Sequence, residues 1–368
     1  MKKLFVSILA VWLIHSTTLF SQARLDSLLP VRCIMIGAPS PDHLNDFLTF
    51  MKKELAPNHI NMMILQVDYN YAYQSYPNLQ DSVVLTTKDV KEIVKTAREL
   101  NIKLVPMINL LGHQSWASHT NPLLTQYPEF DETPWVKMPE KYVWPNPDKL
   151  YCKSYCPLHP EVHKVIFALI DELMDAFETD TFHAGMDEVF YIGEDKCPRG
   201  SGIDKSRLFA DEVRRIHDHL ALKGRKMWMW SDRLLDGSDT GLGEWEASKN
   251  DTWRAIDWIP KDITMCAWHY EHAEPVPAYF AMKGFHVIIC PWRKPQVGVN
   301  ELKEMVMLKQ FSNPVLADKF EGICQTVWNS PEGFMNSYYD KVPEGRRKDM
   351  SAETLKALFK EFNSMSSK

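Results

Sequence analysis

The sequence lacks several features that would assign it to common functional classes. After its N-terminal segment it has no second long apolar run, so we expect no stable membrane insertion once that segment is removed. It has no stripe of Lys and Arg, and the formal net charge is -6 with both signs interspersed, which argues against nucleic acid as a partner. It also has no low-complexity tract and no Gly-rich phosphate loop. What remains is a chain of 368 residues, 45% hydrophobic, that can bury a large core.

The first 23 residues have the pattern of a signal peptide. Lys2 and Lys3 precede a largely apolar stretch, 4–20, and Ser21-Gln22-Ala23 is a small-x-small cleavage site. Polar residues interrupt the apolar stretch, which disfavours an uncleaved membrane anchor. We therefore predict a signal peptide over 1–23, a mature chain over 24–368, and a secreted or periplasmic location.

Seven cysteines occur, an odd number, and they fall into two groups. Four lie in apolar, strand-like runs and are predicted to be buried thiols: Cys33, Cys266, Cys290 and Cys324. The other three lie in loops: Cys152, Cys156 and Cys197. Two of these could form a disulfide, or the three could bind zinc with His159, although their spacing matches no strong zinc pattern. A plain loop role is the third possibility.

Apolar runs alternate with helical patterns along the whole mature chain. Strands are predicted at 31–37, 60–67, 102–109, 181–185, 226–230, 263–268, 285–290 and 322–327. Helices are predicted at 42–55, 87–100 (with Thr87 as N-cap), 161–177, 204–222, 251–259, 276–283, 299–311 and 352–362. Eight strand-helix units predict an α/β fold, a single (β/α)8 TIM barrel over 24–368. A doubly wound open sheet is the alternative, but it would normally have fewer strands.

Chemistry in such a barrel sits at the carboxyl ends of the strands, so the residues that follow each run are the candidate site. Carboxylates, imidazoles and indoles occur there together. Such groups suit the hydroxyls and the apolar faces of a sugar. The candidate substrate-binding residues are Asp68, His113, His183, Trp230, Asp232, Trp268, Tyr270, Trp292 and Trp328. We expect about two of the four indoles to touch sugar, and Asp232 could instead be a helix N-cap.

The most specific segment is 182–189, FHAGMDEV. It resembles the His-x-Gly-Gly-Asp-Glu motif of glycoside hydrolase family 20, the β-N-acetylhexosaminidases. The segment 105–113, which ends in Gly112-His113, and the helix that begins at Thr87 resemble the same family. Arg32 resembles the family's sugar-binding arginine. The likeness covers essentially the whole mature barrel and identifies a divergent, single-domain form.

The resemblance implies an exo-acting β-N-acetylhexosaminidase that hydrolyses terminal β-linked GlcNAc or GalNAc. In this reaction the acetamido oxygen of the substrate attacks the anomeric carbon. The resemblance makes Glu188 the acid and base, Asp187 the group that orients the acetamido N–H, and Tyr270 the candidate partner of the acetamido oxygen. It implies no metal and no cofactor, and an oligosaccharide or glycoconjugate as substrate. Adjacent strand residues point to opposite sides, so Asp187 and Glu188 should not easily form the pair of an ordinary retaining glycosidase.

Three residues depart from the family pattern. Met186 replaces the second Gly of the motif, and Asn109 stands where Asp is frequent. The last strand ends in Trp328-Asn329-Ser330, without the usual Trp-x-Glu. These differences indicate a changed terminal sugar preference.

Three other functions can be tested against this one. A metal-dependent hydrolase would use His113, His183 and Asp232, although such sites usually show a His-x-His pair on one strand and the pair His217-x-His219 lies in a predicted helix. A non-catalytic glycan-binding barrel would not need both Asp187 and Glu188. A glycosidase of the same fold would act on sugars without an acetamido group.

Overall fold

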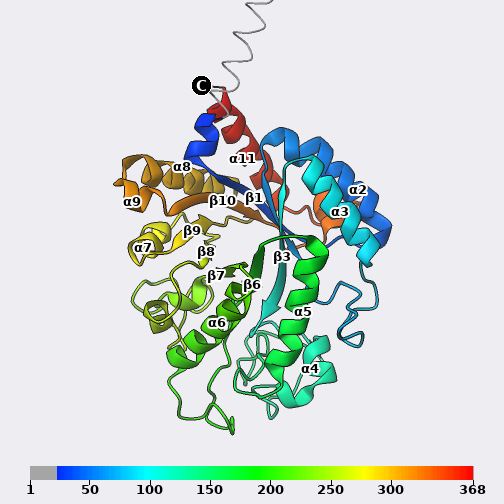
Figure 1. Ribbon diagram of the computed structural model, residues 1–368, viewed down its shortest axis with the longest axis vertical. Coiled ribbons are helices and arrows are strands. Elements are labelled where there is room, and N and C mark those ends of the chain that lie inside the picture. The colour runs from blue at the N-terminus through cyan, green and yellow to red at the C-terminus, as the bar shows by residue number, and fades with distance from the viewer. Residues whose placement is uncertain (1–22, 368) are drawn as a thin grey trace, which may run out of the picture.

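The computed structural model describes residues 23–367, and in it eight parallel strands close into one barrel (Figure 1). Around the barrel the strands follow the order β1-β2-β3-β6-β7-β8-β9-β10, and β10 pairs with β1. Their bounds are β1 Val31–Gly37, β2 Met62–Gln66, β3 Lys103–Leu110, β6 Thr181–Gly185, β7 Lys226–Trp230, β8 Thr264–Ala267, β9 His286–Ile289 and β10 Phe320–Thr326. The predicted signal peptide lies outside the described residues except for Ala23, and it stays a prediction.

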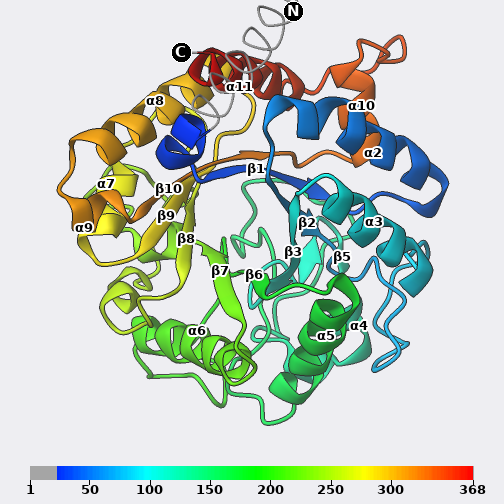
Figure 2. The same cartoon turned by 45° about the horizontal axis from the view of Figure 1, so that its top comes forward.

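Helices form a ring outside the barrel (Figure 2). Those of seven or more residues are α2 Leu44–Phe50, α3 Thr87–Glu99, α5 Val162–Phe177, α6 Lys205–Ala221, α7 Val276–Met282, α8 Pro295–Phe311, α10 Pro331–Tyr338 and α11 Ser351–Ser366. Two shorter helices, α4 Pro122–Gln126 and α9 Pro314–Ala317, and a small hairpin of β4 Ser115–Trp116 and β5 His119–Thr120 lie in the connections. The predicted (β/α)8 barrel is confirmed. Within residues 23–367, no helix combines the length and apolarity needed to cross a bilayer.

Helix α3 shows how the local sequence produces this ring. Thr86 accepts a hydrogen bond from the Asp89 N–H while the Asp89 side chain accepts from the Thr86 N–H, which is a capping box. The predicted N-cap, Thr87, was therefore wrong by one residue. Val90, Ile93 and further apolar residues at helical spacing are buried against the barrel.

The helix predicted over 251–259 is also wrong. Only a 3-10 helix, Trp253–Asp257, forms there. Pro260 explains the early end, because its ring disfavours helical backbone at the preceding residue and it has no N–H to donate. Lys261 Nζ donates to the Ile256 carbonyl at 2.5 Å and thereby satisfies one of the last carbonyls of the turn.

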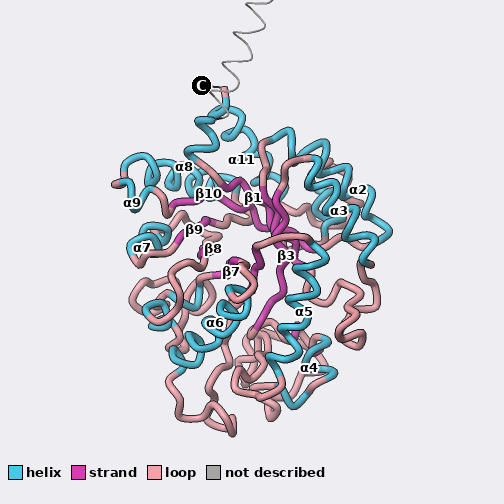
Figure 3. Tube along the Cα trace, in the orientation of Figure 1, coloured by secondary structure: helices cyan, strands magenta, loops and turns pink. Residues whose placement is uncertain are grey.

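The barrel interior is filled by side chains of alternate strand residues. They include the four cysteines predicted to be buried, and all four are free thiols in the interior: Cys33, Cys266, Cys290 and Cys324. The long connections gather beyond the carboxyl ends of the strands, at the end of the molecule where α4 lies (Figure 3). The packed interior therefore supports a mouth that is built from strand ends and loops.

One buried acid on α8 gives a pH-dependent stability prediction. Glu301 is fully buried, and neither carboxyl oxygen has a hydrogen-bond partner among the described residues. Burial raises the pKa of Glu301 well above its ordinary value of 4.5. The folded state thus keeps a proton that the unfolded chain releases, so this carboxyl's contribution is complete below pH 4.5 and is lost as the pH rises toward the folded pKa.

Glu301→Gln keeps the shape but cannot ionise. We expect the variant to unfold at higher urea than the wild type at pH 8, by about 1–3 kcal/mol in unfolding free energy. The unfolding free energies of the two proteins should become similar near pH 4. A constant difference at both pH values would contradict the explanation.

Candidate active site

The backbone leaves strand β6 in an unusual conformation just before the two motif carboxylates. Gly185 has φ 67°, Met186 has φ 73° and Glu188 has φ 48°, all in the left-handed region. A Cβ at Gly185 would come within 2.4 Å of Asn109 Oδ1, so only glycine fits there. The left-handed conformation costs Met186 roughly 1–2 kcal/mol. Its side chain is fully buried in the core, and this burial offsets the cost. Gly185 thus gives the backbone the freedom to turn directly before the two carboxyl residues.

This turn aims Asp187 and Glu188 at the same imidazole. His113 Nε2 lies 3.2 Å from Asp187 Oδ2 and 3.1 Å from Glu188 Oε2. The expectation that adjacent residues would point to opposite sides is wrong here, because β6 ends at Gly185 and the positive φ values bring both carboxylates to one wall of the mouth. The three side chains lie within 4.8 Å of one another and could also hold a metal ion.

The electrostatics of this group favour a charged imidazole. Burial alone lowers the pKa of His113, but the charge of Asp187 and the close contacts of the ring with the Asp187 and Glu188 carboxyl groups outweigh it and raise the pKa well above the ordinary value. His113 thus places a positive charge beside the Asp187 and Glu188 carboxyl groups. Asp187 Oδ1 is buried and has no hydrogen-bond partner among the described residues.

His183 has a different role from His113. Its Nδ1 accepts a hydrogen bond from the Gly185 N–H at 3.1 Å, so Nε2 carries the proton. Burial lowers the pKa of His183 to about 3, and the ring is neutral. The ring packs on Trp230 with centroids 4.5 Å apart, and within the described chain no contact joins it to Glu188. His183 therefore packs at the bottom of the mouth and does not contact Glu188.

Two further carboxylates hold the loops that carry the site. Asp232 Oδ2 accepts the Glu188 N–H at 3.0 Å and the Arg233 Nε–H at 2.7 Å, so it fixes the Glu188 backbone instead of capping a helix. Asp68 accepts the Asn109 N–H at 2.7 Å. Burial raises the pKa of Asp68 and that of Asp232 to about 6. Asp232 Oδ1 is buried and has no partner among residues 23–367, so it can still accept a hydrogen bond.

The predicted aromatic residues form one continuous wall. Tyr270 stacks on Trp268 with centroids 4.9 Å apart and contacts Trp292 at 5.2 Å. Its hydroxyl accepts the Trp328 indole N–H at 2.9 Å. Trp328 also contacts Trp230 at 5.7 Å. Three indole N–H groups, those of Trp230, Trp268 and Trp292, are buried without partners among residues 23–367. Such unsatisfied donors are expected where a polar ligand completes a site.

Arg32 does not belong to this site. It is the second residue of β1, at the amino end of the strand, whereas the mouth is built at the carboxyl ends. Its buried guanidinium donates to the His59 carbonyl at 2.7 Å and to the Leu29 carbonyl at 2.6 Å, and it pairs with Asp26 at 2.8 Å. The prediction that Arg32 binds sugar is wrong, because position along the strand decides which end of the barrel a side chain reaches.

Sequence analysis missed a second aromatic group at the mouth. Tyr151, from the loop between β3 and α5, lies 6.2 Å from the His113 ring and 4.8 Å from Trp245. Trp116 and Trp144 complete this group and are about half exposed. The frequency of aromatic residues in segment 111–160 could have indicated most of it, whereas Trp245 is the single aromatic residue of 231–250. Next to Trp245, Glu246 accepts the Tyr270 N–H at 3.2 Å and so fixes the end of β8.

Comparisons with known proteins place the chain in a family. Residues 61–296 match the family described as glycosyl hydrolase family 20, catalytic domain. A lacto-N-biosidase of Bifidobacterium bifidum is 24% identical over 216 residues, which are 56% of this chain and 17% of the relative. Beta-hexosaminidase 1 of Coccidioides posadasii is 23% identical over 271 residues, 66% of this chain and 40% of the relative. This chain thus spans less than half the length of either protein.

Solved structures share the barrel. A chitobiase of Flavobacterium johnsoniae superposes with a TM-score of 0.60 at 17% identity, over 91% of this chain and 51% of its own. A β-N-acetylhexosaminidase superposes with a TM-score of 0.62 at 18% identity, over 91% and 76%. At these identities the superpositions establish the fold alone. The family match, together with the paired carboxylates at the barrel mouth, shows that the chain belongs to glycosyl hydrolase family 20.

Proposed function

We propose that this chain is an exo-acting β-N-acetylhexosaminidase that removes terminal β-linked GlcNAc or GalNAc from an oligosaccharide or glycoconjugate, with retention of configuration. The observation that carries the proposal is the position of Asp187. One of its oxygens faces His113, and the other is buried without a partner in the part of the chain that the structure describes, next to the more exposed Glu188. A buried, unpartnered carboxylate oxygen suits an amide N–H of the substrate.

The reaction has two steps, and each conserves atoms. The acetamido oxygen attacks C1, the bond from C1 to the leaving oxygen breaks, and Glu188 donates its proton to that oxygen. The product is a cyclic oxazolinium, whose N–H donates a hydrogen bond to the Asp187 carboxylate, and this carboxylate stabilises the positive charge that remains on the ring. In the second step Glu188 takes a proton from water, and the water oxygen attacks C1 and reopens the ring.

The exposure of the two carboxyls fits these roles. The Glu188 side chain is 12% exposed and that of Asp187 is 6% exposed. The acid must reach a leaving group and then water, while the stabilising charge is most effective where water is excluded. Both carboxyls lie on one wall, whereas a two-carboxyl double displacement requires them on opposite faces of the sugar.

Tyr270 supports binding of the acetamido group. Its hydroxyl accepts from the Trp328 indole, so its own proton is available as a donor. Burial raises the pKa of Tyr270 well above its ordinary value, which keeps this proton in place. The surrounding wall of Trp268 and Trp292 provides apolar faces for the sugar ring and for the acetamido methyl group.

A panel of aryl glycosides that differ only at C2 and C4 tests the proposal. We expect turnover of the β-N-acetylglucosaminide or the β-N-acetylgalactosaminide, and a rate lower by about 10²-fold or more for the matching β-glucoside and β-galactoside. The departures at Asn109 and at Ser330, which stands where the family has Glu, make the C4 preference the most informative comparison. Hydrolysis of none of these glycosides would reject the proposed activity.

A metal-dependent hydrolase is the second candidate, because His113, Asp187 and Glu188 lie close enough to share an ion. In that reaction a bound ion would activate water, and no acetamido group would be required. Turnover of matched sugars with and without the acetamido group separates this candidate from the first. The zinc content of His113→Ala shows whether any ion that the chain binds lies at this imidazole.

A further inference from the structure

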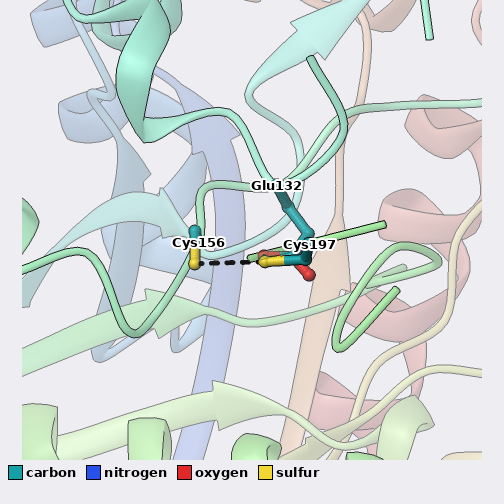
Figure 4. A group of neighbouring side chains, drawn as sticks. All are labelled: Glu132, Cys156 and Cys197. Atoms are coloured by element: carbon teal, nitrogen blue, oxygen red, sulfur yellow. Dashed lines mark hydrogen bonds between the residues drawn. The ribbon is translucent and has the colours of Figure 1, made fainter. Parts of the chain in front are cut away.

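Two loop cysteines and a buried glutamate form a compact cluster beside the mouth (Figure 4). Cys156 Sγ and Cys197 Sγ are 3.8 Å apart, and Cys197 Sγ lies 3.3 Å from Glu132 Oε2. All three side chains are at most 2% exposed, and their ligand atoms lie within 4.8 Å of one another. The third loop cysteine, Cys152, instead donates its S–H to the Glu188 carbonyl at 3.5 Å.

These distances match the edges of a zinc tetrahedron. Zinc–sulfur bonds of about 2.3 Å place two thiolates about 3.8 Å apart, and a zinc–oxygen bond of about 2.0 Å gives a sulfur–oxygen edge of about 3.5 Å. The observed edges are 3.8 Å and 3.3 Å. A disulfide would require the sulfurs at about 2.05 Å, so the side chains would have to move considerably closer.

The groups around the cluster favour a bound cation. The Gly200 N–H donates to Cys197 Sγ at 3.3 Å, and the Glu194 N–H donates to Glu132 Oε1 at 3.2 Å, so backbone donors fix both groups. No Lys or Arg of residues 23–367 forms an ion pair with Glu132. Second-sphere hydrogen bonds of this kind hold ligands in place around a metal, and thiolates favour zinc over calcium or magnesium.

We propose that Glu132, Cys156 and Cys197 bind one structural zinc ion, with a water at the fourth position. His159, which the sequence suggested as a ligand, packs on Phe130 and is not part of the cluster. Glu132 and Cys156 belong to the β3–α5 loop and Cys197 to the β6–α6 loop. The ion therefore links the loop that carries His113 to the loop that carries the two catalytic carboxylates, without touching the reacting atoms.

The test is the zinc content of the full chain, purified without a histidine tag and dialysed after loading with zinc. We expect about one zinc ion per wild-type chain, and loss of this ion in Cys197→Ser and Glu132→Gln. Cys152→Ser is the matched control, since Cys152 is also a buried loop cysteine but lies outside the cluster, and it should keep the ion. Chelation should lower the Tm of the wild type and of Cys152→Ser, but not that of Cys197→Ser.

Wild-type protein alone provides a second measurement if the variants fold poorly. Cobalt loaded in place of zinc should show thiolate-to-metal charge-transfer absorption, which zinc should displace. An intact mass lower by two hydrogens, with five alkylatable thiols out of the seven cysteines, would show a disulfide and overturn the proposal. So would metal-free protein with seven free thiols, or an ion that is lost in His113→Ala but kept in Cys197→Ser. None of these readouts uses a sugar, so their failure is distinct from failure of the proposed activity.

Discussion

Replacing Glu188 with glutamine should lower kcat for oligosaccharide substrates by about 10²–10⁴-fold, because general acid catalysis is worth this much when the leaving group is poor. The substitution keeps the size of the side chain. The Glu188 N–H still donates to Asp232 Oδ2, so the backbone turn that aims both residues should persist. KM should change little, since the lost proton transfer occurs only in the transition state.

The leaving group provides the internal test of this prediction. An aryl glycoside with a very acidic phenol needs little protonation, so its first step should be much less impaired than that of an oligosaccharide. Asp195→Asn is a matched control, because Asp195 is an exposed acid of the same loop. It should leave both rates unchanged. Glu188→Gln with near wild-type activity on oligosaccharides would show that another group is the acid.

Strand-end positions explain why much of this site could be predicted. In a closed parallel barrel, the residue that follows each apolar run lies at one mouth, whatever its distance in sequence. Asp68, His113 and Tyr270 come from β2, β3 and β8 and were predicted on this basis. The same rule explains why the prediction for Arg32 is wrong. Arg32 lies at the amino end of β1, so its charged side chain forms an ion pair at the bottom of the barrel and not at the mouth.

Other features depend on geometry that a local pattern does not contain. The convergence of Asp187 and Glu188 on one imidazole requires positive φ values around them, and Met186, a residue that rarely adopts this conformation, is one of the three. Cys156 and Cys197 are 41 positions apart and meet because their loops leave adjacent strands, β3 and β6. Sequence spacing left their pairing open for this reason.

Asp187→Asn is the second prediction with a large effect, and it separates substrate assistance from the alternatives. If the acetamido oxygen is the nucleophile, Asp187 stabilises positive charge that exists only as the ring closes. A charge-assisted hydrogen bond is roughly twice as strong as a neutral one, and loss of one preorganised electrostatic partner typically lowers kcat by about 10²–10³-fold. We therefore expect a loss in kcat of this size on 2-acetamido glycosides, with a smaller increase in KM.

The effect should depend on the substrate, and this dependence is the decisive measurement. Asp187→Asn should impair the 2-acetamido glycoside far more than any residual hydrolysis of the matched 2-hydroxy glycoside. Asp68→Asn is the control. Asp68 is another carboxylate at the mouth with a raised pKa, but it accepts a backbone N–H from Asn109, so its loss should affect both glycosides alike.

A thiazoline mimic of the cyclised intermediate provides an independent readout of the same interaction. Its ring nitrogen would take the place of the acetamido N–H beside Asp187 Oδ1, the buried oxygen that has no partner within the described chain. Tight inhibition of the wild type, weakened in Asp187→Asn in proportion to the loss in kcat, is expected if this carboxylate stabilises the transition state. An enzyme with a protein nucleophile or a metal-bound water would gain little from the mimic. Equal turnover of the two matched glycosides by the wild type, without thiazoline inhibition, would reject substrate assistance while leaving the barrel and the family unchanged.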